Sequence, residues 1–372
     1  MDKIKVLIVD DSVVVRRIIS DTLSSDSALE IVGVAANGHF ALDKIARLKP
    51  DIITLDIEMP VMDGLQTVTE IRKLYPRLPV IMFSTLTERG ARASLDALAL
   101  GANDYVTKPS NVGSVGAAMN CLREDLIPKI KALCGQTAAR SLIQKAQPAP
   151  AATGSSDRPV VIRPGRKERI DILAIGVSTG GPNALAELIP AIPADFPVPI
   201  VIVQHMPPVF TRLLAERLDS KSAIKVYEGI LDASIEPGQA WLAPGDFHMQ
   251  VERSQRGSKI KLNHDPQENS CRPAVDVLFR SVAKSYGPNV LAVIMTGMGH
   301  DGLIGCEHIL RAGGQVIVQD EASSVVWGMP GAVSRAGLAD QVLPLNQLAA
   351  EISKRARFGR SGVAAPMQTA AL

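Results

Sequence analysis

Short runs rich in β-branched residues alternate with segments of helix length through most of this chain. In the first half these runs cover residues 4–9, 31–35, 51–55, 79–83 and 105–107, and in the second half residues 172–177, 198–203, 290–296 and 315–318. Strands separated by helix-length segments indicate right-handed β-α-β units, which build a parallel sheet covered on both faces. The alternation therefore predicts an α/β fold for both halves.

The chain is long enough for two domains, and its composition changes between them. It has 372 residues, whereas a typical domain has about 150. Residues 135–169 are rich in Ala, Gln, Pro, Ser and Lys and lack the apolar periodicity that would offset the entropy cost of ordering them. We therefore predict a first domain over residues 1–125, a helix end and flexible interdomain linker over 126–168, a second domain over 169–355 and a disordered tail over 356–372.

The middle of the second half interrupts the alternation. Residues 240–243, 248–252 and 259–263 have the pattern of short strands or of a hairpin inserted in the sheet. We expect this domain to be a doubly wound parallel sheet with an inserted β-hairpin. In open α/β sheets the ligand site lies beyond the carboxyl ends of the strands, so those ends are where chemistry is expected.

Composition excludes several classes of protein. Lys and Arg number 40 against 38 Asp and Glu, a balance too near neutral for a protein that depends on nucleic-acid phosphates. No run of 18 apolar residues could cross a bilayer, and Asp10 and Asp11 interrupt the first apolar run before it resembles a signal peptide. The four cysteines form no CxxC pair that would indicate zinc or disulfides. We expect a cytoplasmic protein that neither binds nucleic acid nor inserts in a membrane.

Polar side chains follow four strands of the first half. Asp10 and Asp11 follow the first strand, Asp56 the third, Ser84 and Thr85 the fourth, and Lys108 the fifth. A single aspartate there would more simply begin a turn, but three carboxylates at one sheet edge repel each other unless a hard cation or an ammonium neutralises them. An oxygen-only cluster suits Mg²⁺. A carboxylate beside Mg²⁺, a hydroxyl and an ammonium is equipped to attack a phosphoryl donor.

These residues resemble those of the receiver domain of two-component response regulators, over residues 1 to about 125. The resemblance implies a flavodoxin-like (βα)5 fold, with Asp56 as the phosphoacceptor and Mg²⁺ held by Asp10, Asp11, Asp56 and the backbone carbonyl of Glu58. It also implies that Ser84 is the switch hydroxyl, Lys108 the phosphate-sensing lysine and Tyr105 the aromatic whose rotamer follows the switch. Thr85 adjoins Ser84 in sequence. Because neighbouring strand residues point to opposite faces, at most one of these two hydroxyls can reach the phosphoryl group.

A glycine-rich turn, residues 176–182, follows the first strand of the second half. Two mechanisms compete for such a strand-turn-helix, a dinucleotide-binding turn and a nucleophile elbow of the form G-x-S-x-G. The dinucleotide interpretation needs glycine where Ser178 stands and an acid after the next strand, which instead ends in Gln204 and His205. A serine at a helix N-terminus has an exposed hydroxyl and nearby N–H groups for an oxyanion. The elbow is therefore favoured.

A serine nucleophile needs a base, and the base needs an acid to orient it. His205 ends the adjacent strand, a position that the other histidines, His39, His248, His264, His300 and His308, do not share. Asp301 lies in the glycine-rich turn after residues 290–296, where it could alternatively cap the following helix. The chain order Ser, His, Asp differs from that of α/β-hydrolases.

Five short motifs of the second half together resemble the catalytic domain of chemotaxis protein-glutamate methylesterases, over residues 171–354. They are Ser178-Thr179-Gly180-Gly181, Gln204-His205-Met206-Pro207, Ala243-Pro244-Gly245, Thr296-Gly297-Met298-Gly299 and Gly328-Met329-Pro330. The resemblance implies Ser178 as nucleophile, His205 as base, Asp301 as its orienting acid and the Met298 backbone N–H as an oxyanion donor, with no cofactor for this reaction.

The two resemblances imply a phosphorylation-activated hydrolase of glutamate γ-methyl esters on methyl-accepting chemotaxis receptors. They also imply glutamine deamidation, a chemotaxis histidine kinase as phosphodonor and a receiver packed over the hydrolase cleft; we further expect a monomer. The alternative is a non-enzymatic module in which phospho-Asp56 controls binding to a receptor or kinase. A DNA-binding regulator is disfavoured because no helix-turn-helix pattern follows the linker.

Overall fold

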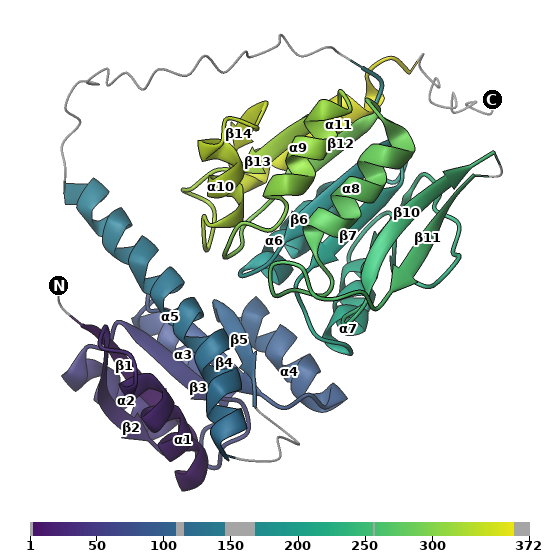
Figure 1. Cartoon of the computed structure of the whole chain (residues 1–372). Helices are drawn as coiled ribbons and strands as arrows, with labels where there is room; N and C mark the ends of the chain where they lie inside the picture. The colour runs from purple at the N-terminus through teal and green to yellow at the C-terminus, as the bar shows by residue number, and fades with distance from the viewer. Residues whose placement is uncertain (1–2, 109–114, 146–167, 256, 361–372) are drawn as a thin grey trace, which may run out of the picture.

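The computed structural model describes residues 3–108, 115–145, 168–255 and 257–360, which form two α/β domains (Figure 1). The first domain contains β1 (Ile4–Val9), α1 (Val13–Ser24), β2 (Leu29–Ala35), α2 (Gly38–Leu48), β3 (Ile52–Asp56), α3 (Gly64–Leu74), β4 (Val80–Ser84), α4 (Glu88–Ala99), β5 (Asp104–Thr107) and α5 (Val115–Lys145). Its five parallel strands have the order β2-β1-β3-β4-β5. The flavodoxin-like (βα)5 prediction is confirmed.

Alternation along the strands fills two cores in this domain. On β1, Leu7 and Val9 pack with α2, α3 and α4, whereas Val6 and Ile8 pack with α1 and α5 on the opposite face. The helices begin where polar side chains cap them, as at Asp63, whose carboxylate accepts from the Gln66 N–H in a capping box. Each strand therefore leads, through a short loop, to a helix that covers one face.

The second domain has a seven-stranded parallel sheet of order β14-β13-β12-β6-β7-β9-β8. Its elements are β6 (Ile172–Val177), α6 (Gly181–Leu188), η1 (Ile189–Ala191), β7 (Ile200–Gln204), α7 (Phe210–Asp219), β8 (Lys225–Glu228), β9 (Gln239–Leu242), β10 (His248–Ser254), β11 (Gly257–Asn263), α8 (Val275–Tyr286), β12 (Val290–Ile294), α9 (Leu303–Arg311), β13 (Gln315–Gln319), α10 (Met329–Arg335), β14 (Gln341–Leu343) and α11 (Leu345–Arg357). The strand order reverses at β6, which lies between β7 and β12. Such a switch point opens a crevice at the carboxyl end of the strand.

Parts of this architecture differ from the expectation. The predicted hairpin exists as β10 and β11, but it forms its own antiparallel sheet, while residues 239–242 join the parallel sheet as β9. Strands β8 and β14 were not predicted, because they are short edge strands with polar residues in a half-exposed setting.

The expected linker and tail also begin later than predicted. Helix α5 continues through residues 126–145, because the Ala, Gln and Lys residues that helped to suggest a linker are also strong helix formers. Helix α11 ends at Arg357, with Ala356 buried, and Arg360 donates a hydrogen bond to the Ile170 carbonyl at 2.6 Å. Residues 146–167 and 361–372 of the predicted linker and tail lie outside the described residues. No helix in the described part of the chain is long and apolar enough to cross a membrane.

The two domains meet where α4 and β5 pack against α6 and α7, a contact that we call the domain interface (Figure 1). At its centre the Tyr105 and Phe210 rings stack, with centroids 4.6 Å apart and planes 6° from parallel. The Thr179 hydroxyl donates to the buried Asp104 carboxylate at 3.0 Å. Its rim carries ion pairs, such as that between Arg217 and Asp96 at 2.8 Å.

Replacing Phe210 by alanine tests how much the domain interface contributes to stability. Phe210 is fully buried, and removing a buried phenylalanine side chain costs about 3–5 kcal/mol. We expect Phe210→Ala to lower the midpoint of urea denaturation clearly, and the exposed Phe40→Ala to change the free energy of unfolding by about 0.5 kcal/mol or less. Equal shifts for the two variants would contradict the described packing.

Candidate functional site

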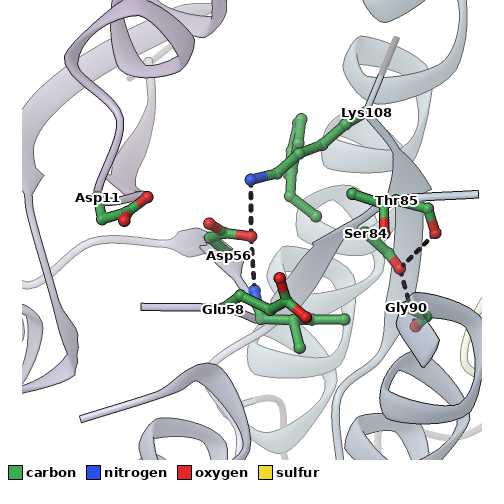
Figure 2. Close-up of a pocket in the computed structure, with 9 residues that line it drawn as sticks. Asp11, Asp56, Glu58, Ser84, Thr85, Gly90 and Lys108 are labelled. Carbon is green, nitrogen blue, oxygen red and sulfur yellow. Dashed lines mark hydrogen bonds and ion pairs between the residues drawn. The ribbon is translucent and has the colours of Figure 1, made fainter. Parts of the chain in front are cut away.

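The first candidate site lies at the carboxyl ends of β1, β3 and β5. Carboxylate oxygens of Asp10, Asp11 and Asp56 lie within 4.8 Å of one another. Lys108 Nζ lies 2.8 Å from Asp56 Oδ1 and 3.1 Å from Asp10 Oδ2. Figure 2 shows Lys108 and Asp56 facing each other across a pocket that Asp11 and Glu58 also line. The structure thus brings together the residues that the strand ends predicted.

The electrostatics of this cluster favour a cation. Burial raises the pKa of Asp56, although the hydrogen bond from Lys108 opposes the rise and the charge of Asp10 adds to it. Burial works against the Lys108 ammonium, but Asp56 and Asp10 outweigh burial and raise its pKa. Asp10 Oδ2 is buried and faces the Lys108 ammonium at 3.1 Å. An all-oxygen cluster of three carboxylates with one ammonium beside it fits a hard divalent ion such as Mg²⁺.

The other predicted residues of this domain have partners outside the carboxylate cluster. The buried Ser84 hydroxyl donates to the Gly90 carbonyl at 2.9 Å, so it is turned toward α4 (Figure 2). The Thr85 hydroxyl instead bonds Thr87 Oγ1. The Glu58 carboxylate pairs with Arg89; the prediction for Glu58 concerns its backbone carbonyl and is not tested by this contact. Tyr105 is buried in the domain interface.

The second candidate site lies at the switch point after β6. The Ser178 N–H donates to the Thr296 carbonyl at 3.0 Å, which ties the turn to the segment that follows β12. Gly180 has φ +76°, a left-handed conformation that favours glycine. Gly297 lies against Ser178, because a Cβ added there would be 2.8 Å from Ser178 Cβ. Ser178 therefore stands at a helix N-terminus between close glycine-rich turns.

His205 and Asp301 form a close pair beside this turn. His205 Nε2 lies 2.8 Å from Asp301 Oδ2. Asp301 also accepts hydrogen bonds from the backbone N–H groups of residues 275, 276 and 302 and from Asn269 Nδ2. Burial acts to raise the pKa of Asp301, but the hydrogen bond and charge of His205 and these N–H donors outweigh it and lower the pKa. The carboxylate is therefore kept charged and holds one imidazole nitrogen.

The structure does not complete the predicted triad. No hydrogen bond joins Ser178 Oγ to His205 in the part of the chain that the structure describes. The second ring nitrogen of His205, Nδ1, instead lies 3.5 Å from Cys271 Sγ. Met298 follows Gly297, which lies against Ser178, and no backbone hydrogen bond of the described chain uses the Met298 N–H. This leaves that N–H without a backbone acceptor. The roles of these four residues stay predictions.

Other histidines have structural surroundings. His248 is buried, with Nε2 facing the Pro266 carbonyl and Nδ1 accepting from the Ala274 N–H. His300 is exposed although it adjoins Asp301 in sequence. The position at the end of a strand therefore identified the histidine that pairs with a buried carboxylate.

Three residues of this site escaped the sequence reasoning. Asn269 and Cys271 lie in the segment before α8, which follows the β10–β11 hairpin and not a strand of the parallel sheet. Asn269 donates to both Asp301 and Asp276 at 2.9 Å. Gln204 was noted in its motif, yet its side chain also acts here, since Nε2 donates to the Ser178 carbonyl at 3.0 Å. The one sequence signal that could have indicated Asn269 and Cys271 is that they lie in a polar run directly before the amphipathic helix α8.

Enlarging Gly297 tests how tightly the Ser178 turn is constrained. A Cβ there would lie 2.5 Å from Met329 Sδ and 2.8 Å from Ser178 Cβ, so the turn must shift. We expect Gly297→Ala to slow labelling of Ser178 by a serine-directed covalent probe by about 10²-fold, the scale of a 1 Å misplacement. Gly135→Ala, where the added Cβ meets nothing within 4 Å, is the matched control. Unchanged labelling of Gly297→Ala would contradict the described packing.

Known proteins match both halves of the chain. A family model described as CheB methylesterase matches residues 173–352, and one described as response regulator receiver domain matches residues 6–120. The protein-glutamate methylesterase/protein-glutamine glutaminase of Trichodesmium erythraeum (strain IMS101) is 55% identical over 359 residues, covering 95% of this chain and 99% of that protein. The protein of the same name from Nocardioides sp. (strain ATCC BAA-499 / JS614) is 51% identical over 355 residues, covering 95% and 96%.

The chain is also similar to a solved structure. The crystal structure of the Thermotoga maritima CheB methylesterase catalytic domain is 42% identical, with a TM-score of 0.49, and covers 50% of this chain and 99% of that one. Each family match falls in the half of the sequence that carries the corresponding resemblance.

Proposed function

The chain belongs to the protein-glutamate methylesterase/protein-glutamine glutaminase family, in which a receiver domain precedes a CheB methylesterase domain, and from this we propose its reaction. It hydrolyses glutamate γ-methyl esters on the cytoplasmic part of methyl-accepting chemotaxis receptors, releases methanol, and also deamidates receptor glutamines. The observation that carries this proposal is the pair formed by the buried Asp301 and the partly buried His205 beside the Ser178 turn. The non-enzymatic alternative is not favoured, because nothing in it requires such a pair.

The geometry supports nucleophilic catalysis by Ser178. Ser178 Oγ attacks the ester carbonyl while His205 Nδ1, the nitrogen that Asp301 leaves free, accepts its proton. The Met298 N–H donates to the oxyanion. The imidazolium then gives its proton to the departing methoxide, and a water molecule, activated in the same way, cleaves the acyl-enzyme to glutamate. An amide follows the same course with ammonia as the leaving group, which depends more on protonation by His205.

The receiver site supports phosphorylation at Asp56 by a chemotaxis histidine kinase. An Asp56 oxygen attacks the phosphorus of a phosphohistidine, the P–N bond breaks, and an acyl phosphate forms. Asp10, Asp11, Asp56 and the Glu58 carbonyl would hold Mg²⁺, which when bound neutralises phosphoryl charge. Lys108, already 2.8 Å from Asp56, pairs with the phosphoryl oxygens.

We propose that the receiver covers the esterase site until Asp56 is phosphorylated. Thr179, next to the nucleophile, is bonded to Asp104, and Met298 packs against an apolar cluster that joins Val326 of the second domain to residues of β1, α1 and α5. The Ser84 hydroxyl donates a hydrogen bond to the Gly90 carbonyl of α4, a helix of the domain interface. When Ser84 instead donates to a phosphoryl group, this hydrogen bond to α4 is lost and the interface loosens.

Substitution of the nucleophile tests the proposed reaction. Because the oxyanion donor alone gives little turnover, we expect Ser178→Ala to lower methanol release from methylated receptor membranes by at least about 10³-fold. His300→Ala, at an exposed position near the site, should retain activity. Full methanol release by Ser178→Ala would refute the assignment of the nucleophile.

Charge reversal at the rim of the domain interface tests the regulation. Asp96 pairs with Arg217 at 2.8 Å across the interface; Asp96→Arg replaces attraction by repulsion, and exposed pairs are worth about 0.2–1 kcal/mol. We expect Asp96→Arg to raise methanol release without phosphodonor by about 2–5-fold. The double variant Asp96→Arg/Arg217→Asp should return it to the basal rate. An unchanged or lower rate for Asp96→Arg would count against occlusion by the receiver.

A further inference from the structure

The second ring nitrogen of His205, Nδ1, which Asp301 does not contact, has another partner in this structure. Asp301 Oδ2 lies 2.8 Å from His205 Nε2, and Cys271 Sγ lies 3.5 Å from Nδ1 on the other side of the ring. The imidazole is therefore held between a carboxylate and a thiol. Ser178, which would have to use Nδ1, has no hydrogen bond to the ring among the described residues.

The position of Cys271 is set by several contacts of its own segment. The backbones of Cys271 and Glu268 bond each other in both directions, at 2.8 and 3.2 Å. Glu268 pairs with Arg280 of α8, and Arg272 pairs with Asp246 at 2.6 Å. Because both flanks are tied to the domain, the backbone of Cys271 is held beside the ring, within reach of its sulfur.

One nitrogen lone pair cannot serve two partners at once. If the proton between sulfur and nitrogen lies on sulfur, Nδ1 accepts from the thiol; if it lies on nitrogen, Nδ1 donates to the thiolate. In neither form can Nδ1 accept a proton from Ser178. We propose that Cys271 is a positioning residue that holds the second nitrogen of His205 in the resting enzyme, so that the base serves Ser178 only when this contact opens.

The charges around the ring agree with this role. Burial opposes the imidazolium, but the charge of the Cys271 sulfur and the hydrogen bond to Asp301 outweigh burial and raise the pKa of His205 to about 10. The other charged groups here act through Asp301: Asp276 and Arg280 lie near it, and Arg280 is paired with Glu268. Removing the sulfur therefore removes a stabilising partner of the imidazolium and lowers the pKa of His205.

The pH dependence of methanol release tests the inference, which rests on His205 being the base of the proposed reaction. We expect the acid limb of the kcat/KM profile of Cys271→Ala, which reports the pKa of the free enzyme, to move to lower pH by about one unit. Cys271→Ser, which keeps a hydroxyl but not an ionisable sulfur, should move in the same direction. Cys134→Ser, which replaces a thiol of the first domain, is the matched control. Profiles of Cys271→Ala and Cys271→Ser that superimpose on that of the unmodified chain would overturn the inference.

A second measurement separates this inference from the proposed function. The ¹⁵N resonances of the His205 ring report its tautomer and its pKa in the full chain without any substrate. We expect Cys271→Ala to change the Nδ1 resonance and to lower the ring pKa, while Cys134→Ser changes neither. Ring resonances unaffected by Cys271→Ala would overturn the inference whatever the esterase does, whereas a shifted ring in a chain that releases no methanol would refute the function alone.

Discussion

The second domain is organised around one buried carboxylate. Asp301 is almost removed from water and stays charged because it accepts five hydrogen bonds, from His205, Asn269 and the backbone of residues 275, 276 and 302. Those donors belong to the loop directly after β7, to the segment before α8, to α8 itself and to the turn before α9. Keeping Asp301 ionised therefore requires elements far apart in sequence to assemble, and the same assembly orients His205.

The sequence predicted the parts of both sites that follow strands of parallel sheets. Asp10, Asp56, Lys108, Ser178 and His205 could be found because the carboxyl ends of such strands must meet at one edge. Asn269 and Cys271 could not be predicted in this way, since their segment reaches the site through contacts with α8. No periodic pattern in the sequence indicates those contacts. The unformed hydrogen bond between Ser178 and His205 was equally hidden, because a list of triad residues does not specify which partner each ring nitrogen has.

Elsewhere, ambiguous signals set the limit of sequence-based prediction. The residues that suggested a linker after residue 135 are good helix formers, and whether such a stretch is helical depends on the preceding turns, where Leu126, Ile130 and Leu133 pack on the first domain. A receiver packed over the hydrolase cleft was expected, but no sequence pattern marked the residues of the domain interface. Tyr105 was predicted as a switch residue, but its stacking on Phe210 is a contact between surfaces of two domains.

The two halves of the domain interface are covalently joined, and this changes what its modest contacts have to achieve. Between separate molecules, one stacked pair, one buried hydrogen bond and several exposed ion pairs would give weak association. In one chain the partner is present at an effective concentration in about the millimolar range, whatever the amount of protein in the cell. Docking is then a unimolecular equilibrium that a change of a few kcal/mol can invert, and its position is independent of expression level.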